Sequence, residues 1–183
     1  MTYKKKAIFL DRDATLIEDG PFLSDPAKIR FLPGTIDGLK SFKELGFLLI
    51  LITNQSGIGR GYFSEDKLTE IHRLLQHQLG KHTIALDAIY YCPHTPDDKC
   101  TCRKPEPGLF LKAVSEHAID PLVSYSIGDK VEDAIAGKTV GCKTILLTKI
   151  FSNSMVSVDH VADDFGSAVG WIKKDLVQKD GEG

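Results

Sequence analysis

Two aspartates stand one residue apart at the end of an apolar stretch, in "IFLDRDAT" at residues 8–15. Carboxylates held this close raise each other's proton affinity unless a cation lies between them. Asp11 and Asp13 therefore indicate either a solvated turn or a site for a divalent metal ion. The triplet alone does not decide between the two, because Asp-x-Asp is a weak signal.

A hydroxyl group and several backbone donors stand where a second apolar run ends. "FLLILIT" (47–53) closes with Thr53, whose hydroxyl can donate to a phosphoryl oxygen. The loop that follows begins with "NQSG", whose backbone N–H groups are suited to binding an anion. Substrate-binding roles are accordingly predicted for Asn54, Gln55 and Ser56.

Two further segments carry groups for a metal ion and a phosphate. "YSIGD" (125–129) ends with Asp129, which together with Asp11 would supply carboxylate ligands to an octahedral Mg²⁺ ion. "RKPEPG" (103–108) adds the ammonium group of Lys104. If the segments converge, they form a pocket with Mg²⁺, a lysine and a hydroxyl around a nucleophilic carboxylate.

The elements that must position these groups alternate between strand and helix. Short, nearly continuous apolar runs are typical of strands buried on both faces of a parallel sheet. Helical spacing of apolar residues separates these runs, at 36–45, at 68–79 after an N-cap at Ser64, and at 109–117. The alternation predicts an α/β fold, a Rossmann-like parallel sheet flanked by helices, with ligands at the carboxyl ends of the strands. The runs are 6–11, 47–54, 88–92, 125–129 and 143–148, followed by a last strand at 160–164 and a covering helix through 169–176.

A cluster of cysteines and one histidine occupies "CPHTPDDKCTC", with the spacing C-x-H-x5-C-x-C. Three thiolates and an imidazole give the closed tetrahedral coordination of structural Zn²⁺. A disulfide or a chance cluster is the alternative, and a reducing compartment disfavours the disulfide. Because Arg103 and Lys104 follow the last cysteine at once, zinc would position both cations. The predicted zinc ligands are Cys92, His94, Cys100 and Cys102.

Length and composition describe an ordinary globular chain. The 183 residues predict one domain (1–183) without a large cap domain, and a net charge of -2 argues against nonspecific binding to nucleic acid or anionic lipid. The basic N-terminus is followed by too short an apolar stretch for a signal peptide, and no run approaches the ~18 residues of a membrane span. We therefore expect a cytoplasmic monomer that acts on a small molecule.

Four motifs carry a resemblance to a known superfamily. "FLDRDAT", "LITNQSG", "CRKPEPG" and "SIGDKVED" resemble, in order, the motifs of haloacid dehalogenase (HAD) phosphatases over about residues 7–148. More narrowly, "ITNQSGIGRGYF" and "YYCPH" are similar to the heptose bisphosphate phosphatases, which remove the 7-phosphate from D-glycero-D-manno-heptose 1,7-bisphosphate. Histidinol-phosphate phosphatases share much of the pattern, and the short spacing between His94 and Cys100 is more like theirs. We expect heptose bisphosphatase activity, with histidinol phosphate or another small sugar phosphate as the alternative substrate.

The resemblance implies a role for each motif residue. Asp11 would attack phosphorus to form an aspartyl phosphate, and Asp13 would act as general acid and then as general base. The Asp11 carboxylate, the Asp13 backbone carbonyl and Asp129 would bind Mg²⁺. Thr53 and Lys104 would hold the transferring phosphoryl group.

Without a large cap, the pocket is expected to be open and shaped by residues 16–30, by "SGIGRGYF" (56–63) and by the zinc loop. Such a pocket suits a small, doubly charged substrate. Arg103 and Lys130 are predicted to pair with phosphate oxygens or sugar hydroxyls.

Ala14 is a departure from the family, which usually has glycine after the second aspartate. If this position requires a positive φ, alanine strains the loop. We nevertheless expect the activity to be retained.

A noncatalytic phosphoacceptor module is the alternative from another functional class. Response-regulator receivers also combine acidic residues, a threonine and a lysine around Mg²⁺ on a parallel sheet. They lack a second aspartate arranged as acid and base, and they lack a zinc loop.

Overall fold

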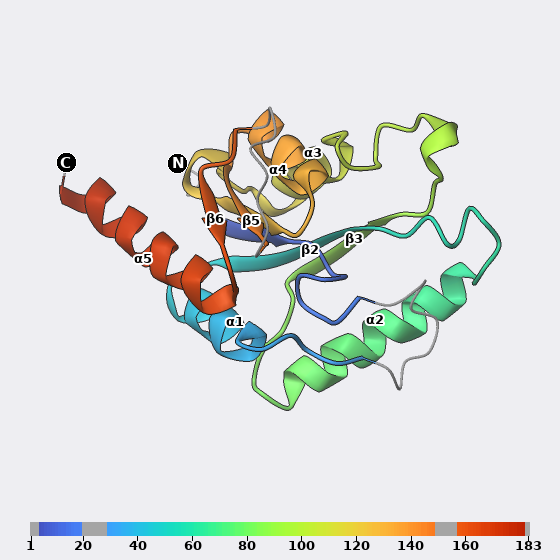
Figure 1. Ribbon diagram of the computed structural model, residues 1–183, viewed down its shortest axis with the longest axis horizontal. Coiled ribbons are helices and arrows are strands. Elements are labelled where there is room, and N and C mark those ends of the chain that lie inside the picture. Colours follow the sequence, from blue (N-terminus) through green and yellow to red (C-terminus); the bar gives the residue numbers. More distant parts are fainter. Residues whose placement is uncertain (1–3, 20–28, 149–156, 182–183) are drawn as a thin grey trace.

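Six strands form one parallel sheet in the order β3-β2-β1-β4-β5-β6 (Figure 1). The computed structural model describes residues 4–19, 29–148 and 157–181. Each predicted strand is confirmed, with ends that differ from the apolar runs by at most two residues. The strands are β1 Ala7–Leu10, β2 Leu48–Asn54, β3 Ala88–Cys92, β4 Tyr125–Gly128, β5 Lys143–Leu147 and β6 His160–Ala162.

Helices cover both faces of this sheet (Figure 1). Helices α1 (Thr35–Glu44), α2 (Glu65–Gly80) and α5 (Phe165–Gly181) pack against one face, and α3 (Gly108–His117) and α4 (Val131–Val140) against the other. The N-cap predicted for the second helix is confirmed, since the backbone N–H of Lys67 donates to Ser64 Oγ at 3.2 Å. No helix in the described ranges is both long and apolar enough to cross a bilayer.

The strand order separates this fold from that of the receiver modules. Receivers have the flavodoxin-like order 2-1-3-4-5, whereas the order here, 3-2-1-4-5-6, is that of the six-stranded Rossmann fold. The strand order therefore counts against the receiver alternative. The order reverses between β1 and β4, and ligands of doubly wound sheets bind at this switch point.

The first strand is buried along its whole length. Ile8 and Leu10 contact the core beneath α1 and α5, while Ala7 and Phe9 contact the core beneath α3 and α4. Burial of one large apolar side chain stabilises the fold by about 1.5–3 kcal/mol, so both faces hold the strand in place. The residue that follows Leu10 is consequently placed by rigid structure at the switch point.

Candidate active site

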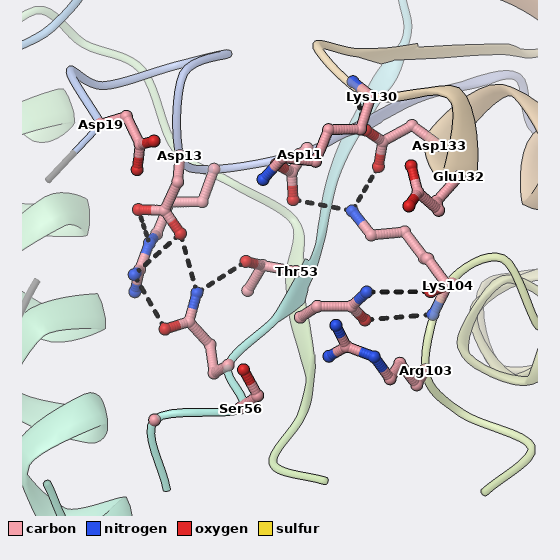
Figure 2. Close-up of a pocket in the computed structure, with 14 residues that line it drawn as sticks. Asp11, Asp13, Asp19, Thr53, Ser56, Arg103, Lys104, Lys130, Glu132 and Asp133 are labelled. Carbon is pink, nitrogen blue, oxygen red and sulfur yellow. Dashed lines mark hydrogen bonds and ion pairs between the residues drawn. The ribbon is translucent and has the colours of Figure 1, made fainter. Parts of the chain in front are cut away.

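A cleft of about 450 Å³ opens at the carboxyl ends of β1, β2 and β4 (Figure 2). Helix α4 and the loop between β3 and α3 complete its walls. The described residues that line the cleft carry five carboxylates and four cationic side chains, so acidic groups are in slight excess. Among the predicted site residues, the cleft brings together Asp11, Asp13, Thr53, Asn54, Gln55, Ser56, Arg103, Lys104 and Lys130.

Lys104 is the cation at the centre of the cleft floor. Its side chain is 4% exposed, and its Nζ lies 2.7 Å from Asp11 Oδ1 and 2.5 Å from Asp133 Oδ1. The ammonium also donates to the backbone carbonyl of Ile52 at 2.6 Å. Burial by itself would lower the pKa of Lys104, but the carboxylates of Asp11 and Asp133 outweigh burial and raise it. The lysine is therefore charged and fixed beside the Asp11 carboxylate.

Asp133 connects this lysine to the start of α4. One carboxylate oxygen meets Lys104, and the other accepts a hydrogen bond from the backbone N–H of Lys130 at 3.1 Å. Gly128 makes room for this carboxylate, because a Cβ atom there would lie 2.3 Å from Asp133 Oδ2. Asp133 thus caps the helix and also holds the cleft lysine.

Three carboxylates meet at the switch point in a geometry that fits a divalent cation. One oxygen each of Asp11, Asp129 and Asp133 lies within 4.8 Å of the others. Burial first, and then the Asp11 charge, raise the pKa of Asp129 to about 7. Oxygen ligands with mutual repulsion of this kind are typical of a Mg²⁺ site, where the ion's charge offsets the repulsion.

The predicted zinc ligands converge between the end of β3 and the start of α3. Cys102 Sγ lies 3.2 Å from Cys92 Sγ, 3.3 Å from Cys100 Sγ and 3.2 Å from His94 Nδ1. Cys92 Sγ lies 3.6 Å from both Cys100 Sγ and His94 Nδ1. A tetrahedron with Zn–S bonds of about 2.3 Å has S–S edges of about 3.8 Å, close to these separations. The four residues therefore fit a tetrahedral metal site once Cys102 Sγ moves outward by about half an ångström.

The loop between β3 and α3, which carries the cysteine cluster, is joined directly to the cleft. Asn54, at the end of β2, pairs with the backbone of Lys104 through two hydrogen bonds of 3.0 Å, one donated by Asn54 Nδ2 and one accepted by Oδ1. Lys104 follows Cys102 by two residues, so the cysteine cluster and the Asn54 amide hold the same short segment. Arg103, between them, donates to the His94 carbonyl at 3.4 Å.

Some functional groups of the cleft were not found from sequence. Glu132 lines it, and so does Arg12, whose side chain is 1% exposed and directed at Asp13. Asp19 also lines the cleft, and it belongs to the segment 16–30 that was expected to shape the pocket. The sequence carried no signal for Arg12 beyond its place between the two aspartates, because its other partners, Gln55 and His72, come from distant elements. Of the predicted loop at 16–30, residues 20–28 lie outside the described residues.

Ala14 lies in the left-handed region, with φ +54°. The turn that it forms is closed by the N–H groups of Leu16 and Ile17, which both donate to the carbonyl of Arg12. This is the conformation for which the family's glycine is suited, and alanine pays about 1–2 kcal/mol there. Position 14 therefore has the positive φ at which alanine is strained.

Ala14→Gly should stabilise the protein by about 1 kcal/mol, which raises Tm by about 2–4 °C for a chain of this size. Calorimetry measures the effect. Ala118→Gly is the matched control, since Ala118 ends α3 with φ +52° and lies outside the cleft lining. We expect a similar gain there, and turnover of Ala14→Gly within about threefold of the parent. A lower Tm for Ala14→Gly would contradict the strain.

Comparison with known proteins places these features in one family. The HAD-hydrolase-like family model matches residues 101–168. The D-glycero-beta-D-manno-heptose-1,7-bisphosphate 7-phosphatase of Pasteurella multocida is 46% identical over 151 residues, covering 79% of this chain and 82% of the relative. A probable D-glycero-D-manno-heptose-1,7-bisphosphate 7-phosphatase of Thermoplasma volcanium is 42% identical over 127 residues, covering 69% and 87%.

A solved structure agrees with the sequence relatives. The D,D-heptose 1,7-bisphosphate phosphatase of B. bronchiseptica, complexed with magnesium and phosphate, superposes with a TM-score of 0.85 at 29% identity and covers 93% of this chain and 99% of its own. The relatives share more than 40% of their residues with this chain over more than two thirds of its length, which establishes the family. The chain belongs to the D-glycero-D-manno-heptose-1,7-bisphosphate 7-phosphatase family of HAD-like hydrolases.

Proposed function

We propose that this protein hydrolyses the 7-phosphate of D-glycero-D-manno-heptose 1,7-bisphosphate through an aspartyl-phosphate intermediate. The observation that carries the proposal is the convergence of Asp11, Lys104 and Asp129 at the switch point of the sheet. The relatives that are 41–46% identical and are named for this activity support the substrate. Their names specify the beta anomer in most cases, so we expect this anomer to be preferred.

Asp11 is the nucleophile of the proposed reaction. Its Oδ1 is held by Lys104 at 2.7 Å, which leaves the other carboxylate oxygen to attack phosphorus. Lys104 also places positive charge beside the transferring group, and Thr53 stands at the end of the adjacent strand with its hydroxyl near the cleft floor. These groups act by position and charge, as phosphoryl transfer requires.

The cleft residues would hold Mg²⁺ through the carboxylates of Asp11 and Asp129 and the backbone carbonyl of Asp13. The bound ion supplies charge that offsets repulsion between the nucleophile and the phosphate. Zn²⁺ would be held by Cys92 and the other three ligands of the cysteine cluster, where its role is to fix the loop that presents Lys104.

Asp13 is proposed to move the protons of both half-reactions. It protonates the sugar oxygen as the bond to phosphorus breaks, and then takes a proton from the water that opens the aspartyl phosphate. Its side chain is 18% exposed, so it reaches the cleft while its carboxylate is supported from behind.

Arg103 and Lys130 are assigned to the second phosphate and the sugar hydroxyls, because both line the cleft. Burial would lower the pKa of Lys130, but the charges of Asp129 and Asp11 outweigh it and raise the pKa. Ser56 is directed at the same space. The amide groups of Asn54 and Gln55 are committed to protein partners, so we assign both residues to positioning other groups of the site.

Phosphate release from a substrate panel tests the proposal. In the presence of Mg²⁺, kcat/KM for the beta anomer of the heptose bisphosphate should exceed that for histidinol phosphate by at least about tenfold, since losing one charged phosphate contact costs about 1.5–3 kcal/mol. Arg103→Met should reduce this ratio. A higher kcat/KM for histidinol phosphate would overturn the substrate assignment.

A further inference from the structure

Arg12 is the largest side chain that is fully buried in the described structure. Its guanidinium forms a two-pronged contact with the carboxylate of the next residue, with Nε donating to Asp13 Oδ1 at 3.1 Å and Nη2 donating to Oδ2 at 3.0 Å. A planar guanidinium that grips both oxygens fixes the plane of a carboxylate as well as its position.

The far side of the guanidinium is held by two residues from other elements. Nη2 donates to Gln55 Oε1 at 2.9 Å, and Nη1 lies 3.4 Å from His72 Nε2, on α2. Arginine has only donors, so His72 Nε2 must be the unprotonated acceptor of this pair. Burial first, and then the Arg12 charge, lower the pKa of His72 to about 3, which keeps the imidazole neutral.

Gln55 closes the arrangement on the cleft side. Its Nε2 donates to Asp13 Oδ2 at 2.9 Å and to Thr53 Oγ1 at 2.8 Å. Figure 2 shows these bonds converging on Asp13 on one side of Thr53, while Asp11 meets Lys104 on the other. The two aspartates are thus held by separate sets of partners.

The unequal contacts of the two Asp13 oxygens indicate which one carries the proton. Within the described residues, Oδ2 accepts from both Arg12 and Gln55, whereas Oδ1 accepts only from Arg12 Nε. Oδ1 therefore retains an acceptor position for a proton that is exchanged with the leaving group or with water.

We propose that Arg12 is a positioning residue, which together with Gln55 and His72 holds the Asp13 carboxylate in the orientation needed for proton transfer. The inference rests on the proposed function, in which Asp13 is the acid and base. The geometry of Arg12 counts against direct phosphate binding, because the guanidinium is buried and four of its five N–H groups face Asp13, Gln55 and His72. A general acid must stand within hydrogen-bond reach of the atom it protonates, so loss of the grip should slow proton transfer alone.

Substrates that differ in leaving group test this role. A sugar alkoxide needs a proton when it leaves, whereas p-nitrophenolate leaves as a stable anion without one. In Arg12→Met we expect kcat for the heptose bisphosphate to fall about 100-fold with KM little changed. The rapid first release of p-nitrophenolate from p-nitrophenyl phosphate should stay within about threefold of the parent, because this step needs no acid.

A double variant separates positioning from a general loss of structure. Arg12→Met combined with Asp13→Asn should be no more than about threefold slower than Asp13→Asn alone, since both changes act through one group. Arg73→Met, on the exposed face of α2, is the matched control and should match the parent. Multiplicative losses in the double variant, or an equal loss on both substrates, would overturn the proposal.

His72→Leu is the milder variant if Arg12→Met does not fold. It removes the acceptor behind the guanidinium and should give about a tenfold loss on the sugar substrate only, with the exposed His77→Leu unchanged. An unchanged rate for His72→Leu would contradict its part in holding Arg12. The parent enzyme could release no phosphate from the heptose bisphosphate and yet show the nitrophenolate burst. The substrate assignment would then fail. The same variants, compared on another alkyl phosphate, would still decide the role of Arg12.

Discussion

Asp11→Asn is expected to lower kcat for phosphate release by at least about 10⁴-fold while the protein stays folded. An amide has nearly the same shape as a carboxylate, but its oxygen is a poor nucleophile and it carries no charge for a metal ion. Lys104 keeps its ion pair with Asp133 and its bond to the Ile52 carbonyl, so the ammonium is not left without partners. Loss of one charge also relieves repulsion with Asp129.

Phosphate release and circular dichroism melting together check this expectation. Asp37→Asn is the matched control, because Asp37 is exposed in the first turn of α1 and far along the chain from the cleft residues. It should retain full activity. If Asp11→Asn kept more than about a hundredth of the parent rate, Asp11 would not be the nucleophile.

The meeting of the site residues at one edge of the sheet was predictable, because each residue stands directly after a short apolar run that is visible in the sequence. A parallel strand buried on both faces is a short apolar run, and such runs end where the chain leaves the core. Asp11, Thr53 and Asp129 each stand at such an end, and parallel pairing brings those ends to one edge. The cysteine cluster was predictable for a similar reason, since its four ligands lie within eleven residues, from Cys92 to Cys102.

The partners of these residues were not predictable, because they depend on packing between distant elements. His72 meets Arg12 across 60 positions of sequence, and nothing in the helical pattern of α2 distinguishes this histidine from an ordinary buried one. Asn54 was expected to bind substrate, yet its amide pairs with the backbone of Lys104, 50 positions away. The conformation of Ala14 was foreseen only as a condition, since φ is set by the turn that closes on Arg12.

These long-range contacts divide the site into two supported halves. Lys104 and Asp133 support Asp11, the proposed nucleophile, and Arg12 and Gln55 support Asp13, the proposed acid and base. Phosphoryl transfer depends on placing both halves around one phosphorus atom, so each group must be held before substrate arrives. The loop that carries the cysteine cluster contributes to the first half alone, because it presents Lys104.

Removal of zinc is therefore expected to lower stability and activity together. Structural zinc contributes several kcal/mol to folding, and each kcal/mol shifts Tm by about 2–4 °C at this chain length, so Tm should fall by about 10 °C or more. The segment that contains Lys104 would keep its hydrogen bonds to Asn54 and Ile52 and its ion pairs but lose the fixed cysteines that precede it, and kcat/KM should fall at least about tenfold. Both should return when stoichiometric Zn²⁺ is added.

The measurement needs metal analysis to verify zinc removal, with Mg²⁺ restored before each assay so that the cleft ion is not the variable. Cys102→Ser should reproduce the loss and should not respond to added zinc. Cys142→Ser is the matched control, since Cys142 is buried among apolar residues and stands outside the cluster. Unchanged melting after verified zinc removal would show that the loop is held by protein contacts alone. Zinc binding by the cysteines would then contribute nothing to the placement of Lys104.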